Sequence, residues 1–304
     1  MDKDLLSMAD LSGPEVRGLI QSAVELKRQG NSDMLAGRSV ALVFELPSLR
    51  TRASFDVGIR QMGGHCIYLS PQEIGLGARE SVPDVARVLS RYVDGIVART
   101  RRHRTVADLA RYALVPVING LSDGEHPCQV LADLLTIYEH KGRLEGLTIA
   151  YLGDGNNMAA SLSLGAMLVG ANFVMATPEA YLLPPETLAK VENLRGESGA
   201  AFEVKVGPAE AVSGADVIYT DVWTSMGQEA ESERRRRDFT GYQVTAELLS
   251  HADDGAIFMH PLPAHRGEEV SDDAMEHPQS VVFDQAENRL HAQKAVLAQL
   301  LGRS

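Results

Sequence analysis

The sequence predicts an α/β protein of two doubly wound domains, each built on a parallel sheet, with its active site expected in the cleft between them. Short apolar runs rich in β-branched residues alternate with amphipathic helical segments, which is the pattern of βαβ units. A polar, glycine-containing segment at residues 141–146 interrupts the pattern, which then starts again. The 304 residues suffice for two domains of ordinary size. Parallel sheets bind ligands at the carboxyl ends of their strands, so we expect the site there.

The first domain is expected to cover residues 1–142. Its first helix is predicted from a capping box, in which Ser12 is followed three positions later by Glu15, with Pro14 in the first turn. We expect the C-terminal helix, residues 287–304, to pack back onto this domain. The other predicted strands are 40–44, 66–69, 95–98 and 115–118, and the other predicted helices are 51–62, 81–92, 106–112 and 127–140.

The second domain is expected to cover residues 143–286. Its segment 223–238 is predicted to be a long charged loop, a kind of loop that is usually functional or mobile in a compact domain. The arginine run at 234–237 follows three glutamates and is predicted to be a solvated face. The predicted strands are 148–152, 173–176, 202–206, 217–221, 256–259 and 281–283, and the predicted helices are 157–169, 185–194, 209–213 and 245–251.

Composition and charge exclude several classes of protein. The net charge is −12 and the pI is about 5.2, so the chain should repel nucleic acid and anionic membranes, and a local basic cluster indicates a dedicated site. The N-terminus lacks the layout of a signal peptide, and no apolar run approaches the ~20 residues that span a bilayer. The two cysteines, Cys66 and Cys128, show no metal-ligand spacing. We predict a cytoplasmic protein without nucleic-acid, membrane or metal partners.

Residues 40–52 contain the strongest local signal for a ligand. An apolar strand ends before Pro47, and Ser48 is then a good N-cap for a helix that carries Arg50, Thr51 and Arg52 in its first turn. Helix N-termini bear unpaired N–H groups and partial positive charge, so this turn predicts a phosphate or carboxylate site. The alternative is a capped helix with two surface arginines.

Three more polar residues of the first domain are candidates. Arg99 ends a predicted strand and could place a second cation on the bound anion, or it could simply be exposed. His126 lies just before a helix that Pro127 begins, where it could donate to a carbonyl oxygen or serve only as a cap. Gln129 is one turn further on the same side. The remaining histidines show no paired ligand spacing, which makes a zinc site unexpected.

The second domain carries candidates at three strand ends. The turn at 153–157 is a poor match to a dinucleotide fingerprint, and its Asn156 and Asn157 could instead hold a carboxylate at a helix N-terminus. Asp221 ends an apolar strand and would suit an ammonium group. The turn at 260–266 contains two prolines whose backbone carbonyls could face a ligand, and Pro263 could be cis.

In combination, these motifs resemble the aspartate/ornithine carbamoyltransferase family over essentially the whole chain, and the ornithine-using members most. The family patterns are present as Ser-Leu-Arg-Thr-Arg at 48–52, His-Pro-Cys-Gln at 126–129, Asp-Gly-Asn-Asn at 154–157 and Ser-Met-Gly at 225–227. Three positions depart from the ornithine pattern. Leu49 replaces a threonine, Pro261 replaces a cysteine that lies near the reacting amine, and Ala160 stands where a histidine is common.

The resemblance implies a function and a set of residues for it. The activity would be carbamoyl transfer from carbamoyl phosphate to the δ-amine of L-ornithine, without cofactor or metal, by a homotrimer in which the loop at 73–80 completes a neighbour's site. The implied carbamoyl-phosphate residues are Ser48, Leu49, Arg50, Thr51, Arg99, His126, Gln129 and Arg289. The implied ornithine residues are Asn157, Asp221, Ser225 and Met226, and the implied catalytic residues are Arg50, Arg99, His126, Pro261 and Leu262.

Other functions compete with this prediction. Because position 261 is substituted, the acceptor substrate could be another amine, such as putrescine, N-acetylornithine or aspartate. The chain could also be a non-catalytic ligand-binding protein on a transferase scaffold. Both arginines, His126 and Gln129 are retained, although a pure sensor does not need groups that polarise a carbonyl. A nicotinamide-dependent dehydrogenase is disfavoured by the poor glycine fingerprint.

Overall fold

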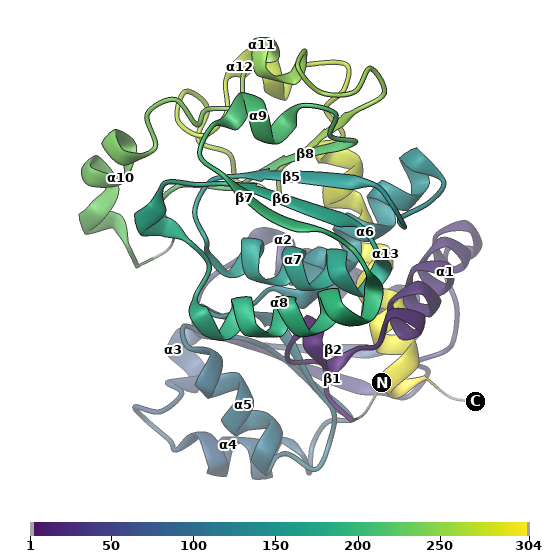
Figure 1. The fold of residues 1–304 in the computed structure, drawn as a ribbon. Helices are drawn as coiled ribbons and strands as arrows, with labels where there is room; N and C mark the ends of the chain where they lie inside the picture. The colour runs from purple at the N-terminus through teal and green to yellow at the C-terminus, as the bar shows by residue number, and fades with distance from the viewer. Residues whose placement is uncertain (1–2, 226, 303–304) are drawn as a thin grey trace. The chain divides into compact units, whose positions relative to one another are not determined.

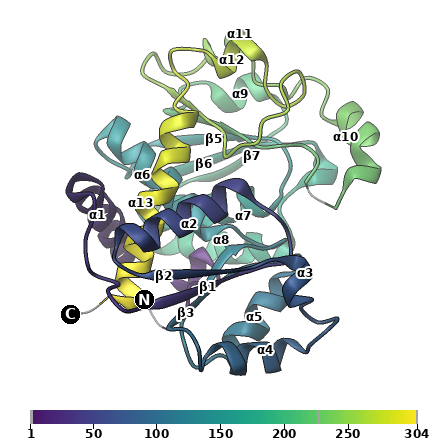
Figure 2. The ribbon, with the colours of Figure 1, turned by 180° about the vertical axis from the view of Figure 1, so that it is seen from behind.

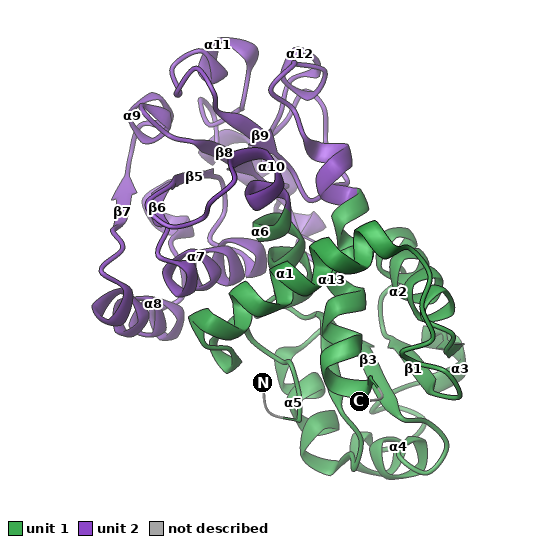
Figure 3. Ribbon diagram, turned by 90° about the vertical axis from the view of Figure 1, so that its right-hand side faces the viewer, with its two compact units in different colours: residues 1–135, 287–304 green, residues 136–286 purple. Residues whose placement is uncertain are grey.

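The structure is a computed structural model that describes residues 3–225 and 227–302 (Figure 1). The chain forms two compact units (Figure 3). Unit 1 comprises residues 1–135 and 287–304, and unit 2 comprises residues 136–286. Helices α6 (Pro127–Lys141) and α13 (Val282–Leu301) each contribute residues to both units. No helix in the described part of the chain is both long and apolar enough to cross a membrane.

Unit 1 is built on a four-stranded parallel sheet with strand order β2-β1-β3-β4. Helix α2 packs against β2 on one face, whereas α4 and α5 pack together on the other (Figure 2). The strands are β1 (Ser39–Phe44), β2 (His65–Leu69), β3 (Gly95–Arg99) and β4 (Val117–Leu121). The helices besides α6 and α13 are η1 (Met8–Asp10), α1 (Gly13–Gln29), α2 (Leu49–Gln61), α3 (Pro71–Ile74), α4 (Val82–Leu89) and α5 (His103–Tyr112).

The local sequence explains how these elements form. Ser12 caps α1 through the predicted capping box with Glu15. In β1, Ala41 and Val43 belong to the core cluster that includes residues of α4 and α5, as the period of two in a strand requires. Strand β1 pairs with β2 on one side and β3 on the other, so it is central to the sheet and buried. The predicted anion turn therefore begins at the end of a central strand.

Two predictions for unit 1 were wrong in detail. The fourth strand was expected at 115–118 but lies at Val117–Leu121. Pro116 has no N–H for the ladder, and Asn119, expected in a loop, donates its backbone N–H to the carbonyl of Leu5. The segment around Leu5 thus forms a bridge to this strand, which therefore extends further than its local sequence predicts. The loop at 73–80 also begins with one turn of helix, α3.

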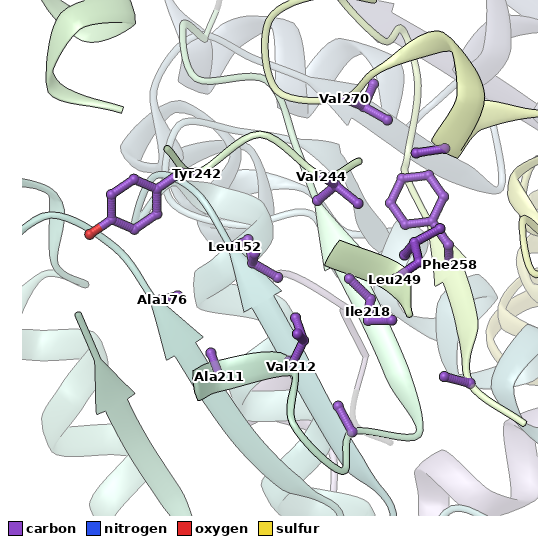
Figure 4. Packing of buried hydrophobic residues seen from close by; sticks show 14 of the residues in the cluster. Leu152, Ala176, Ala211, Val212, Ile218, Tyr242, Val244, Leu249, Phe258 and Val270 are labelled. Carbon is purple, nitrogen blue, oxygen red and sulfur yellow. The ribbon is translucent and has the colours of Figure 1, made fainter. Parts of the chain in front are cut away.

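Unit 2 is built on a five-stranded parallel sheet with strand order β7-β6-β5-β8-β9. Apolar side chains of four of its strands belong to one cluster with residues of α9 and α11, as Figure 4 shows for Leu152, Ile218, Val212 and Leu249. The strands are β5 (Thr148–Leu152), β6 (Asn172–Ala176), β7 (Phe202–Lys205), β8 (Val217–Thr220) and β9 (Ile257–Met259). The helices are α7 (Asn157–Val169), η2 (Glu179–Tyr181), α8 (Pro185–Ser198), α9 (Pro208–Val212), η3 (Glu229–Glu231), α10 (Ser232–Asp238), α11 (Ala246–Leu249) and α12 (Asp272–Met275).

Two predictions for unit 2 were also wrong. No strand forms at 281–283, because α13 begins at Val282 and only an isolated bridge between Phe258 and Ser280 continues the sheet. The segment 223–238 is not a loop throughout, since its second half is helical as η3 and α10. Arg235 in that helix is buried, so the arginine run is not simply a solvated face.

Candidate functional site

The anion turn of unit 1 is organised around the hydroxyl of Thr51. Ser48 is the N-cap of α2, and its Oγ accepts the backbone N–H of Thr51 at 3.2 Å. The Ser48 hydroxyl also lies 3.1 Å from Thr51 Oγ1, to which it donates. Thr51 is fully buried, whereas Leu49 is 81% exposed. The turn therefore presents two coupled hydroxyls and the N-terminus of a 13-residue helix.

Two arginines from distant parts of unit 1 converge on the same hydroxyl. Arg289 Nη2 donates to Thr51 Oγ1 at 2.9 Å, and Arg99 Nη1 does so at 3.5 Å. Arg99 is the last residue of β3, and Arg289 lies on α13. A Cβ atom at Gly58 would come within 3.3 Å of both Leu290 and Lys294, so a glycine on α2 allows α13 to approach closely.

The guanidinium groups of Arg50 and Arg99 lack a neutralising partner among the described residues, since neither forms an ion pair with a carboxylate there. Burial, then the neighbouring charges of Arg289 and Arg50, lower the pKa of Arg99 to about 10. Burial also lowers the pKa of Arg50. Clustered cations of this kind, one buried and one half-buried, favour binding of an anion, which reduces their repulsion.

His126 belongs to the same cluster. It lies immediately before α6 and is 4% exposed. Burial, followed by the charges of Arg289, Arg99 and Arg50, holds its pKa well below the usual value. The imidazole is therefore neutral near pH 7 and can donate one N–H to a carbonyl oxygen.

The unit 2 candidates begin at the N-terminus of α7. Asn156 is the N-cap, and its Oδ1 accepts the backbone N–H groups of Met158 and Ala159 at 2.9 and 3.1 Å. Its Nδ2 donates to Oδ2 of Asp221 at 2.8 Å. Both ends of the Asn156 amide thus have partners inside the protein. Asn157, the first residue of α7, is half-buried.

Asp221 is a buried carboxylate directly after β8. Burial raises its pKa, against the opposing effects of His260 and of hydrogen bonds from Asn156 and the backbone of Val222. Four positions further along, the N–H of Ser225 donates to Oε1 of Gln228 at 3.1 Å. The predicted residue Met226 lies outside the described residues.

The turn after β9 is held by two buried side chains. His260 Nδ1 accepts the N–H of Leu262 at 2.9 Å, and its Nε2 donates to Glu269 Oε1 at 3.0 Å. These two bonds select the tautomer with hydrogen on Nε2. The Leu262–Pro263 peptide bond is cis, as predicted. Pro261 is buried and Leu262 half-buried.

Neither cysteine of the protein belongs to this turn. Cys66 and Cys128 are the two thiols of the chain, and both lie in unit 1. Burial raises the pKa of each to about 12, so both are protonated at neutral pH. With proline at position 261, unit 2 has no thiol that could exchange a proton with a ligand.

An ion pair in unit 2 was not foreseen from the sequence. Arg235 Nη1 donates to Asp154 Oδ2 at 2.7 Å and to the backbone carbonyl of Trp223 at 2.9 Å, and both charged side chains are buried. It links α10 to the turn after β5. The available signal was helical spacing, because Arg235 lies four positions before the buried Phe239.

One group in the described chain has the composition of a metal site. Ligand atoms of His265, Glu268 and Glu269 lie within 4.8 Å of one another. Both carboxylates already have partners, since Glu268 pairs with Arg236 at 2.8 Å and Glu269 accepts from His260 and from the backbone of His265. We therefore describe the group as part of the hydrogen-bonded support of the turn.

Comparisons with known proteins give a consistent result. Residues 3–139 match the family model described as the carbamoyl-phosphate-binding domain of aspartate/ornithine carbamoyltransferase, and residues 145–300 match its aspartate/ornithine-binding domain. An ornithine carbamoyltransferase of Thermococcus kodakarensis is 54% identical over 99% of this chain and 96% of its own length, and one of Archaeoglobus fulgidus is 53% identical over 99% and 98%. The solved ornithine carbamoyltransferase of Pyrococcus furiosus is similar with a TM-score of 0.95 at 50% identity, covering 98% of this chain and 97% of that one.

Proposed function

Because this chain belongs to the aspartate/ornithine carbamoyltransferase family, we propose that it transfers the carbamoyl group of carbamoyl phosphate to the δ-amine of L-ornithine. The products are L-citrulline and phosphate. The observation that carries this proposal is similarity over the full length to proteins named ornithine carbamoyltransferase, at 54 and 53% identity. The family itself includes enzymes for both amino acids, so the amine is assigned from these relatives and from the residues of unit 2.

The phosphate of the donor substrate is assigned to the cluster around Thr51. Arg50 and Arg99 supply cations that lack a carboxylate partner in the described chain, and Arg289 completes the group. Ser48 adds its hydroxyl and the helix N-terminus adds N–H groups. Charge-assisted bonds from guanidinium to phosphate are among the strongest hydrogen bonds in proteins. Leu49 contributes no polar side chain to this site.

The carbonyl oxygen of the carbamoyl group is assigned to Thr51, Arg99 and His126. Thr51 Oγ1 accepts hydrogen bonds from its neighbours, so its own hydrogen remains available to donate. The neutral imidazole of His126 supplies a second donor without adding charge. As the amine attacks, negative charge grows on this oxygen, and each such donor typically contributes ~10²–10³ in rate. Gln129 is assigned to the carbamoyl NH₂.

The second substrate is assigned to residues of unit 2. Asn157 and the segment with Ser225 and Met226 would bind the α-carboxylate and α-amino group, with Asp221 facing the ammonium. The neutral δ-amine attacks the carbonyl carbon, a C–N bond forms, and the bond to phosphate oxygen breaks. With no thiol at position 261, we assign orientation of the amine to the backbone carbonyls of Pro261 and Leu262. The leaving phosphate takes up the proton.

The charge at Asp221 favours an amino-acid substrate with one carboxylate. A second carboxylate, as in aspartate, would need additional cations in unit 2. The buried arginine of this unit, Arg235, is already paired with Asp154. A buried carboxylate next to the substrate repels a second one and attracts an ammonium group.

A substrate panel tests the assignment. We expect kcat/KM, measured as formation of the carbamoylated product, to be highest with L-ornithine and much lower with putrescine, N-acetylornithine and aspartate. Putrescine lacks the α-carboxylate, N-acetylornithine lacks the α-ammonium, and aspartate carries an extra carboxylate, so each removes one of the proposed contacts. A clear preference for any of these three would contradict the substrate assignment. Binding of carbamoyl phosphate without any turnover would instead indicate a ligand-binding protein.

We also propose the assembly and the cellular role that the family resemblance implies. These are a cytoplasmic homotrimer, with the loop at 73–80 completing a neighbour's site, and a place in arginine biosynthesis. Side chains of this loop are largely exposed, so they are accessible to another subunit.

A further inference from the structure

The side chain of Gln129 is held by a buried carboxylate that the reaction does not otherwise use. Gln129 and Asp133 lie four positions apart on α6, so they share one face of the helix. Nε2 of Gln129 donates to Oδ1 of Asp133 at 2.9 Å. Gln129 is 1% exposed and Asp133 is fully buried, so water does not compete for this bond.

This contact determines which end of the Gln129 amide is left for a ligand. A carboxylate accepts hydrogen bonds and therefore selects the NH₂ end of the amide. The carbonyl oxygen, Oε1, must then point away from Asp133. Among the described residues, no hydrogen bond to Oε1 is found. The atom that Gln129 offers to a ligand is thus an acceptor.

We propose that Asp133 is a positioning residue that makes the site selective for a carbamoyl group. By fixing Gln129 with Oε1 toward the ligand, it provides an acceptor for the NH₂ of carbamoyl phosphate. This inference rests on the proposed function and adds the origin of its donor specificity. Acetyl phosphate has a methyl group in place of the NH₂ and would leave Oε1 unpaired. Sites that hydrogen-bond an N–H of the substrate reject analogues that lack it for this reason.

The variant Asp133→Asn tests the inference with little change in shape. An asparagine can accept from Nε2 or donate to Oε1, so it no longer selects one orientation of the Gln129 amide. Calorimetry would measure the affinities for carbamoyl phosphate, acetyl phosphate and inorganic phosphate. We expect the affinity for carbamoyl phosphate to fall by roughly 5- to 100-fold, as for the loss of one buried hydrogen bond. The affinities for the other two should not change, because their contacts do not include Oε1.

Two further variants separate positioning from a general structural role. Asp108→Asn removes a carboxylate from a surface ion pair of α5 and should leave all three affinities unchanged. Gln129→Met removes the acceptor. When Asp133→Asn is added to Gln129→Met, the affinity for carbamoyl phosphate divided by that for acetyl phosphate should not change further. A purely structural effect of Asp133 would persist in both backgrounds.

The outcomes are distinct. An unchanged ratio of the two affinities in Asp133→Asn overturns the inference, and so does an equal loss for all three ligands. If Asp133→Asn does not fold, Asp133→Ser, which also can donate or accept, is measured in the same way and judged by the same ratio. Wild-type protein that binds carbamoyl phosphate but forms no citrulline contradicts the proposed function and leaves this inference standing.

Discussion

Buried charge is arranged in opposite ways in the two units. In unit 1, Arg50 and Arg99 have no carboxylate partner in the described chain. Burial lowers the pKa of Arg99 and of His126, and the neighbouring arginine charges lower both further. In unit 2, Arg235 pairs with Asp154 at 2.7 Å. Unit 1 therefore carries an excess of positive charge at its site, whereas the buried arginine of unit 2 is compensated within the fold.

This difference indicates what each set of charges does. The arginines of unit 1 repel one another in the free protein, and a bound dianion such as phosphate reduces that repulsion. The reduction makes binding of the dianion more favourable. In unit 2, buried polar contacts instead connect segments of chain. Arg235 joins α10 to Asp154 in the turn after β5, and His260 joins the turn at 260–266 to Glu269. Substitutions in unit 1 should thus act on binding and rate, and substitutions of the pairs in unit 2 should act on stability.

The largest effect is expected from Arg50→Ala. Loss of this cation should lower kcat/KM for carbamoyl phosphate by at least ~10²–10³, since it removes a charge-assisted bond to the phosphate. The free energy of unfolding should not fall, because the variant also removes repulsion within the cluster. Arg60→Ala, on the same helix, is the matched control, because Arg60 is exposed and its one ion pair within the described ranges is with Asp56. Retained activity in Arg50→Ala would mean that the anion site is assigned wrongly.

A smaller effect, and on stability rather than rate, is expected from Arg235→Met. Removing one partner of a buried ion pair leaves the other charge uncompensated, and we expect a loss of about 3 kcal/mol in the free energy of unfolding. Urea denaturation would measure it. Replacing Asp154 as well, in Arg235→Met/Asp154→Leu, should restore part of the loss. In Arg236→Met, which breaks an exposed pair on the same helix, the loss should be much smaller, because solvent screens that pair. Equal losses at positions 235 and 236 would contradict the contrast between the units.

The smallest effect concerns Asp221 and pH. The carboxylate must be ionised to hold an ammonium group, and burial raises its pKa. As the pH is lowered, kcat/KM for ornithine should therefore begin to decrease at a higher pH than it would if this aspartate had its ordinary pKa. Asp221→Asn should lower kcat/KM by about tenfold and remove this pH dependence. If kcat/KM of the variant decreases at low pH in the same way as that of the wild type, another group is responsible for the decrease.

The same pKa shift has a consequence for folding. Because the pKa of Asp221 is higher in the folded state, its contribution to stability is fully present below the unfolded pKa and is lost as the pH rises through the folded pKa. At neutral pH the ionised group therefore destabilises the fold. Unfolding in urea as a function of pH should show that the Asp221→Asn variant lacks this decrease.

Much of the fold was predictable because the signals are local. A run of β-branched residues, a proline and a capping serine place the strand, turn and helix around Ser48 without knowledge of the rest of the chain. The errors occurred where a distant segment decides the outcome. Strand β4 is displaced because the segment at Leu5 pairs with it, and the expected strand at 281–283 is absorbed into α13.

The order of most elements, the anion turn after β1 and the family resemblance can be predicted from local sequence patterns. Which side chains meet depends on how the elements pack. Arg289 donates to Thr51 although the two residues are 238 positions apart. Arg235, within a run of charged residues, pairs with Asp154, and Asp133 accepts a hydrogen bond from Gln129. The physical reason is that spacing along the chain fixes the direction of a side chain on its own element, whereas its partner and its burial depend on how elements pack.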